Sequence, residues 1–207
     1  MGGIDTENIR EKHMNIKQII YGITGLPNRI YNTLIMKYRH VKYGKNLRIN
    51  GRIHCVSNTA DGIVIGDDVS INSCLGSNPI GGDTRTILFA KGKGKIRIGD
   101  GCGISNATLF ACDSIMLGSQ ILVGGGTKIY DSDFHWLDFN KRMSELGGAT
   151  SPVVIKDGAF IGAHCIILKG VTIGEKSIVG AGSVVTKSIP DGEIWAGNPA
   201  KFIRRIE

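Results

Sequence analysis

The chain has 207 residues, and its composition, 42% hydrophobic but only 6% aromatic, is that of one domain whose core is built from aliphatic side chains. No stretch approaches the ~20 consecutive apolar residues of a membrane helix, and the polar N-terminus lacks a signal-peptide core, so we expect a cytoplasmic protein. The five cysteines include no CxxC pair, which disfavours a disulfide framework and a zinc site.

The net charge of +7 belongs to the N-terminal part of the chain. Residues 12–60 carry nine Lys or Arg and no acidic residue, whereas residues 61–207 carry fifteen of each sign. We expect residues 1–42 to form a basic, partly helical arm that packs on the rest of the molecule, on a neighbouring subunit, or against the inner face of a membrane. No nucleic-acid-binding motif accompanies the charge, so we expect no nucleic-acid partner.

Within this arm, apolar residues recur at helical spacing in two runs separated by Gly25-Leu26-Pro27, which predicts two short helices. The runs are Ile16, Ile19, Ile20 and Ile23, then Ile30, Leu34, Ile35 and Tyr38.

From residue 43 onward the sequence follows a period of six, which is clearest after residue 155 as IKDGAF, IGAHCI, ILKGVT, IGEKSI, VGAGSV and VTKSIP. A period of six is a multiple of two rather than of 3.6, so it excludes a helix and favours short strands. Three such strands can form one coil, with the first side chain of each hexad pointing inward and the small fifth one at the corner. The first positions are Ile155, Ile161, Ile167, Ile173, Val179 and Val185.

The period lapses from about residue 135 to residue 152. A loop of this length in a compact repeat protein is usually functional. The segment DSDFHWLD at its start places His135 among the acids Asp131, Asp133 and Asp138. An imidazole has a reference pKa of ~6.5, so it can accept and donate a proton near neutral pH.

The hexads end in WAGNPAKFIRRI, from Trp195 to Ile206. Hexads and ending together resemble the hexapeptide-repeat acyltransferases, most closely the sugar and polysaccharide O-acetyltransferases, which include galactoside and maltose acetyltransferases. The resemblance implies an all-β fold: a left-handed parallel β-helix over residues 43–190 with a loop excursion at about 135–152, a short N-terminal helical arm, and a C-terminal tail or clamp over residues 191–207. It also implies a homotrimer with sites between subunits and acetyl-CoA as co-substrate, without a metal.

The segment DSDFHWLD is similar to the family's D-x-D-x-H-x-x-D element, whose histidine is the catalytic base and maps onto His135. A sugar hydroxyl is a poor nucleophile near neutral pH, so the imidazole would take its proton as it attacks the thioester and would then protonate the departing thiol. Asp131 and Asp133 are both candidates to orient the imidazole, and Asp138 is expected to bind acceptor hydroxyls.

Other positions match the family's binding sites for the two substrates. Three groups of residues match the family's contacts with the coenzyme. The segments IGAH and GAGS offer backbone groups, and VVTK matches contacts near the phosphates of the coenzyme. The C-terminal segment WAGNPAKFIRRI matches a cationic clamp. These residues are Ala163 and Ala181, Thr186 and Lys187, and Lys201 and Arg204. For the acceptor, Phe160 matches an aromatic position beside the sugar, and Asn106 lies near a substrate-binding asparagine. His164, in the fourth place of its hexad, is expected to point outward near the coenzyme groove.

The resemblance therefore implies a CoA-dependent acetyltransferase that moves the acetyl group directly, in a ternary complex, to a hydroxyl of a sugar or of a capsule, O-antigen or exopolysaccharide precursor. No domain typical of maltose acetyltransferases precedes the hexads, and the loops Gly76–Thr86 and Ala90–Lys95 also interrupt the period, so a nucleotide sugar or a lipid-linked sugar fits equally well.

Alternatives are N-acetylation of an antibiotic or of a nucleotide amino sugar, and a non-catalytic β-helix scaffold, against which the cationic ending argues. A γ-type carbonic anhydrase is disfavoured, because its zinc needs two histidines close in sequence and the histidines of this chain are far apart.

Overall fold

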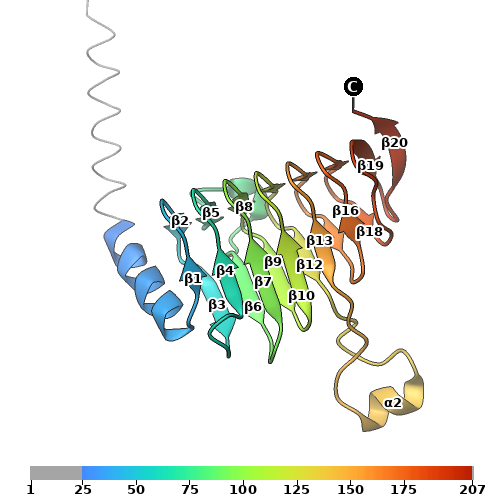
Figure 1. Ribbon diagram of the computed structural model, residues 1–207, viewed down its shortest axis with the longest axis horizontal. Coiled ribbons are helices and arrows are strands. Elements are labelled where there is room, and N and C mark those ends of the chain that lie inside the picture. Colours follow the sequence, from blue (N-terminus) through green and yellow to red (C-terminus); the bar gives the residue numbers. More distant parts are fainter. Residues whose placement is uncertain (1–24, 207) are drawn as a thin grey trace, which may run out of the picture.

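The computed structural model describes residues 25–206, and the molecule is a β-helix of three sheets that wind together as successive coils (Figure 1). In each coil the chain passes from sheet A to sheet B to sheet C, so strands that are neighbours in a sheet come from successive coils. The strands pair in parallel, except that β20 runs antiparallel to β19. The prediction of an all-β, left-handed parallel β-helix with a short N-terminal helix is confirmed.

Sheet A contains β1 (Lys42–Tyr43), β4 (Ile63–Ile65), β7 (Lys95–Ile98), β10 (Ser114–Leu117), β13 (Val153–Ile155) and β16 (Thr172–Ile173). Sheet B contains β2 (Arg48–Gly51), β5 (Ser70–Ser73), β8 (Gly103–Ser105), β11 (Leu122–Val123), β14 (Phe160–Ile161), β17 (Ile178–Val179), β19 (Glu193–Ala196) and β20 (Lys201–Arg205). Sheet C contains β3 (His54–Ser57), β6 (Ile87–Ala90), β9 (Thr108–Ala111), β12 (Lys128–Tyr130), β15 (Ile166–Ile167) and β18 (Val184–Val185). Two short helices interrupt the coils, η1 (Pro79–Gly81) and α2 (Phe139–Ser144).

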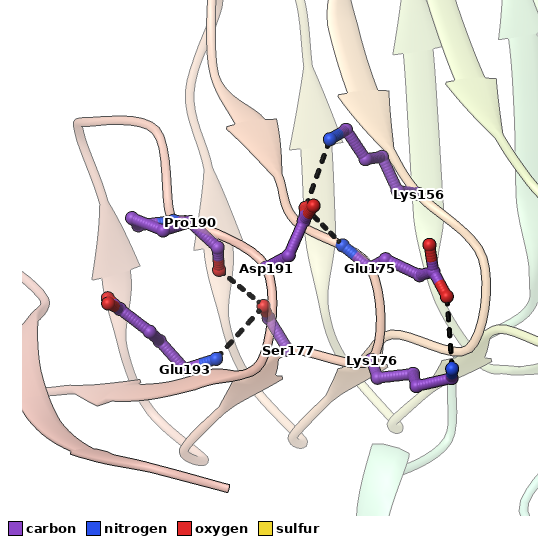
Figure 2. Close-up of polar contacts among 7 residues, drawn as sticks. All are labelled: Lys156, Glu175, Lys176, Ser177, Pro190, Asp191 and Glu193. Carbon is purple, nitrogen blue, oxygen red and sulfur yellow. Dashed lines mark hydrogen bonds and ion pairs between the residues drawn. The ribbon is translucent and has the colours of Figure 1, made fainter.

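The core is a stack of aliphatic side chains in the predicted hexad positions. Every first position from Ile155 to Val185 is buried, and so is every fifth position from Ala159 to Ile189. Burial of one Ile or Val side chain contributes ~1.5–3 kcal/mol, so a ladder of them offsets the chain entropy without aromatic residues. Polar fifth positions bond the next coil: Ser177 Oγ donates to Pro190 O at 2.6 Å (Figure 2).

Aspartates link successive coils at the corner between sheets A and B. Asp191 shows the arrangement, because its Oδ1 accepts from Glu175 N at 2.8 Å and from Lys156 Nζ at 3.0 Å (Figure 2). The next residue, Gly192, has a φ of 68°, a left-handed conformation that glycine adopts without strain. Asp67, Asp100 and Asp157 accept in the same way from the N–H groups of Lys45, Asp67 and Ser119.

Residues 25–38 form a helix at the end of the β-helix, beside the first coil (Figure 1). Its buried face is fixed by Asn32, whose Nδ2 donates to Gly51 O at 2.9 Å and whose Oδ1 accepts from Ile53 N at 3.1 Å. The prediction that Gly25-Leu26-Pro27 separates two helices is wrong for these three residues, because all three are helical in the structure. The other predicted helix, around Ile16–Ile23, lies outside the described residues.

At the other end of the molecule, the C-terminal residues extend sheet B. Strand β19 pairs with β17 in parallel, as one further rung, and β20 folds back on its edge. Within residues 25–206, no helix is long and apolar enough to cross a bilayer.

Candidate active site

Each coil turns from sheet C to sheet A at one corner, which we call the C–A corner. The turns that follow β3, β6, β9, β12, β15 and β18 therefore lie in one column along the molecule. The excursion that contains His135 occurs at this corner, between β12 and β13, and carries α2 at its tip (Figure 1).

The base of the excursion is held by its own backbone. Isolated bridges pair Ser132 with Thr150 and His135 with Gly147. The two arms approach closely, since a Cβ added at Gly148 would lie 2.7 Å from His135 N. His135 is therefore positioned by the paired base of the loop and not by its exposed tip. The His135 side chain is exposed, and its imidazole makes no hydrogen bond or ion pair with any residue in the described range 25–206.

The two carboxylates predicted as partners of this imidazole are engaged elsewhere. Asp131 is buried, and its two oxygens accept from Cys112 N and Asp113 N at 2.8 Å each, which ties the start of the excursion to the preceding coil. Burial raises the pKa of the Asp131 carboxyl, and the two N–H bonds oppose that rise. Asp133 Oδ2 lies 3.4 Å from Lys169 Nζ, a lysine of the C–A corner that the sequence analysis did not single out.

Asp138, predicted to bind acceptor hydroxyls, forms the N-cap of α2. One oxygen of its carboxylate accepts from Lys141 N at 2.9 Å. The sequence predicted a loop here without a helix, because six residues are too few to show helical periodicity.

An aromatic row that the sequence analysis missed leads to the excursion along the outer face of sheet C. Phe89 of β6 stacks on Phe110 of β9 with ring centroids 4.6 Å apart. The Phe134 ring lies 5.1 Å from that of Phe110 and 5.4 Å from that of Tyr130, on β12. Phe89, Phe110 and Tyr130 occupy equivalent places in successive coils, so an alignment of coil on coil could have found them.

A groove lies beside the paired base of the excursion. Its first part is a pocket of about 320 Å³ lined by loop residues and by the turn between β6 and β7. A second pocket of about 920 Å³ continues it onto sheet A, because Lys93, Cys112 and Thr150 line both. The lining of the first pocket is Lys91, Gly92, Lys93, Cys112, Ser132, Phe134, Gly147, Gly148 and Thr150.

Known proteins share both the repeat and the fold. A family profile described as "Hexapeptide repeat of succinyl-transferase" matches residues 152–187. A protein of Schizosaccharomyces pombe that is named as an acetyltransferase is 41% identical over 102 residues, which are 49% of this chain and 48% of that protein. A solved structure of a variant of AntD, an N-acyltransferase from Bacillus cereus in complex with dTDP and coenzyme A, is 25% identical with a TM-score of 0.66, covering 84% of this chain and 89% of that one. A maltose O-acetyltransferase from Clostridium difficile 630 is 22% identical with a TM-score of 0.56, covering 90% and 86%.

The chain therefore carries hexapeptide repeats over residues 152–187 and is similar over part of its length to proteins named as acetyltransferases. It spans between about a third and a half of the length of the curated relatives that it matches. The excursion with His135 lies just before the matched hexads, in the coil that precedes residue 152.

The residues expected to bind the substrates of a hexapeptide-repeat acetyltransferase are divided among three places in a single chain. Thr186 and Lys187 follow β18 and share the C–A corner with His135, whereas Ala163 and Ala181 lie at the corner between sheets B and C. Three others lie on sheet B: Phe160 on β14, and Lys201 and Arg204 on β20, all exposed.

Asn106 and His164 also lie at the corner between sheets B and C, where both hold the insertion Gly76–Thr86. Asn106 Nδ2 donates to Asn78 O at 3.2 Å and to Gly82 O at 3.1 Å. His164 Nε2 lies 2.9 Å from Ile80 O. In this chain both side chains therefore contact the insertion.

Proposed function

We propose that the protein transfers the acetyl group of acetyl-CoA to a hydroxyl of a sugar or glycan precursor, with His135 as general base. The observation that carries the proposal is the placement of His135. Its backbone is fixed at the paired base of the excursion, its imidazole has no partner among residues 25–206, and a groove lined by the same loop opens beside it. A free imidazole beside a groove suits a base that must meet a substrate.

The chemistry needs one proton to move twice. An imidazole nitrogen of His135 takes the proton of the acceptor hydroxyl as the oxygen forms a bond to the thioester carbonyl carbon. The tetrahedral intermediate then breaks its carbon–sulfur bond, and the imidazolium returns the proton to the departing thiolate of CoA. No covalent intermediate with the protein is required, so both substrates bind together.

We also propose that the site forms between subunits of a homotrimer. The positions that match the family's coenzyme contacts lie at three places in one chain: two different corners, on opposite sides of sheet C, and strand β20 of sheet B. A groove between two chains can bring the corner with Ala163 and Ala181 of one against the corner with His135, Thr186 and Lys187 of the other. Light scattering should give the mass of three chains, and a monomer at working concentration would remove this arrangement.

Replacement of His135 tests the base directly. We expect His135→Ala to lower turnover by ~10²–10⁴ while leaving the thermal stabilisation by CoA unchanged, because the imidazole acts on the proton and not on the coenzyme. His54→Ala, which removes an exposed histidine of β3, is the matched control and should keep normal turnover. Near-normal turnover of His135→Ala would refute the proposed mechanism.

An amine acceptor is the second candidate, because AntD, which resembles this chain over most of its length, is named as an N-acyltransferase. A panel of nucleotide sugars, nucleotide amino sugars, free disaccharides and surface glycans, assayed with acetyl-CoA by thiol release, separates hydroxyl from amine acceptors. All five cysteines are unpaired and three of them are buried, which fits a reducing compartment, so we propose a cytoplasmic location.

A further inference from the structure

The groove beside His135 carries a row of cations in the segment AKGKGKIR. Lys91, Lys93, Lys95 and Arg97 stand at alternate positions, and the last two lie on β7, where alternate residues share the outer face of the sheet. Lys91 and Lys93 line the smaller pocket, and Lys93, Lys95 and Arg97 line the larger one. The row therefore follows the groove from sheet A to the loop that holds His135.

Glycines let this row lie close to the neighbouring coil. A Cβ at Gly94 would lie only 2.2 Å from Ala111 O, so the backbone of the turn is pressed against β9. Gly92 has a φ of 61°, which a larger side chain would adopt only with strain. The backbone of the turn thus lies against the neighbouring coil, while the side chains of Lys91 and Lys93 are exposed to solvent.

The positive charges of the row are not neutralised within the described part of the chain. None of these four side chains forms an ion pair with any residue between 25 and 206. Two acids also line the larger pocket, Asp61 and Asp113, but Asp61 is paired with Lys42 at 2.6 Å. The Lys42 ammonium lowers the pKa of Asp61, and Arg97 and Lys95 add to that effect. Like charges so close together repel one another unless an anion lies between them.

We propose that this cation row binds phosphate groups of the acceptor, so the acceptor is a sugar carried on a diphosphate and not a free neutral sugar. The inference rests on the proposed function. The row lies on the N-terminal side of His135 along the C–A corner, whereas Thr186 and Lys187, expected near the coenzyme phosphates, lie on the C-terminal side. The imidazole therefore stands between two cationic stretches, one for each phosphorylated substrate. The aromatic row of Phe89, Phe110 and Phe134 gives a sugar ring a surface between them.

The test uses inorganic pyrophosphate as the probe, in the presence of saturating CoA so that the coenzyme site is filled. Wild-type protein should be stabilised by pyrophosphate in a thermal shift assay, and Lys93→Gln/Lys95→Gln should bind it at least about tenfold more weakly. The control Lys45→Gln/Lys176→Gln removes the same charge at the corner between sheets A and B and should bind pyrophosphate as the wild type does. Lys93→Arg/Lys95→Arg keeps the charge and should restore binding.

The outcomes separate this inference from the proposed function. Equal pyrophosphate binding by wild type and Lys93→Gln/Lys95→Gln, or weaker CoA binding by that variant in place of weaker pyrophosphate binding, would overturn the inference and leave acetyl transfer intact. Absence of any CoA affinity in the wild type would refute the proposed function, while the pyrophosphate assay would still report on the row. Competition by uridine diphosphate and by geranylgeranyl diphosphate in detergent distinguishes a nucleotide carrier from a lipid carrier.

A second inference comes independently from the helix of residues 25–38. Four apolar side chains at every fourth position are exposed, Leu26 at 55%, Ile30 at 54%, Leu34 at 62% and Tyr38 at 71%. They form one stripe, opposite the face on which Asn32 and Met36 are buried. Arg29 and Lys37 border the stripe, and no acidic residue occurs between residues 12 and 60.

We infer that this stripe docks on a membrane surface rich in anionic lipid. An apolar stripe bordered by cations, in a segment without acids, is complementary to such a surface, and burial of each aliphatic side chain contributes ~1.5–3 kcal/mol of transfer free energy.

Full-length protein should sediment with vesicles of phosphatidylglycerol and not with vesicles of phosphatidylcholine. Ile30→Ser/Leu34→Ser should weaken that binding at least about tenfold, while Asn28→Ser, a polar control on the same helix, should not. Failure of the wild type to bind phosphatidylglycerol, or a change of oligomeric state in Ile30→Ser/Leu34→Ser without a change in vesicle binding, would refute a membrane partner and, in the second case, identify a second copy of the chain.

Discussion

The regular coils of residues 153–190 and the excursion of residues 131–152 differ in what fixes each residue. In the coils, a residue's place in the hexad decides whether it is buried, and the first and fifth positions form the core. In the excursion, only the base is fixed, by bridges between its two arms, and the side chains of α2 are all exposed. The comparison suggests that stability and chemistry are carried by separate residues, and each of the following predictions tests that separation.

The largest effect is expected from a rung of the core. Ile167→Ala should lower the free energy of unfolding by ~2–5 kcal/mol, because Ile167 is fully buried and its loss leaves a cavity between coils. Urea unfolding measures the change, and turnover per folded molecule should stay within about twofold of wild type. His135→Ala should show the opposite pattern, with a stability change below ~0.5 kcal/mol. A large loss of stability in His135→Ala would mean that fold and chemistry are not separable here.

A smaller effect is expected where the arms of the excursion meet. Gly148→Ala places a Cβ against the backbone of His135 and should push the arms apart, which displaces the imidazole. We expect turnover to fall about tenfold or more with little change in the KM for acetyl-CoA. Gly147 has a φ of 106°, so it is an unsuitable control, whereas Ala149→Gly keeps the space free and should leave turnover nearly unchanged. A Gly148→Ala enzyme with normal turnover would indicate that the base of the loop does not position His135.

Two substitutions of Asp138 distinguish a role in capping α2 from a role in binding the acceptor. Asp138→Ala removes the N-cap of α2 and should cost the helix ~0.5–2 kcal/mol, seen as faster hydrogen exchange confined to residues 139–144. Asp138→Asn keeps the cap and should restore slow exchange. If Asp138 also binds acceptor hydroxyls, as the sequence predicts, Asp138→Asn raises the acceptor KM; an unchanged KM would limit the residue to capping.

The smallest effect concerns a buried thiol of the coils. Burial raises the pKa of Cys55 from 9.0 to about 12, so the folded state keeps its proton at a pH where the unfolded state loses it. The stability that Cys55 contributes is fully present below pH ~9 and is lost as pH rises toward 12. Between pH 8 and 9.5, the free energy of unfolding should therefore fall about 1 kcal/mol more for wild type than for Cys55→Ala. Equal slopes would show that the thiol is not buried as deeply as the core around it.

The sequence alone determined the coil. A period of six over strands leaves one choice of inward side chain, so the buried rungs from Ile155 to Val185 followed from position alone. The break in the period also located the excursion and His135. Residues of the excursion do not stack in the core, so they pointed to a role other than stability.

The tertiary structure decided which residues meet across coils. Successive coils differ in length because insertions such as Gly76–Thr86 and residues 91–94 fall between their strands, so sequence spacing does not give the register. Only the folded chain shows that Asp131 is held by Cys112 and Asp113, that Phe89 stacks on Phe110, and that the lysines of a turn between sheets line the groove beside His135. The physical reason is that each of these contacts joins residues of neighbouring coils. Which residues face one another therefore depends on how the coils stack, and not on their spacing in the sequence.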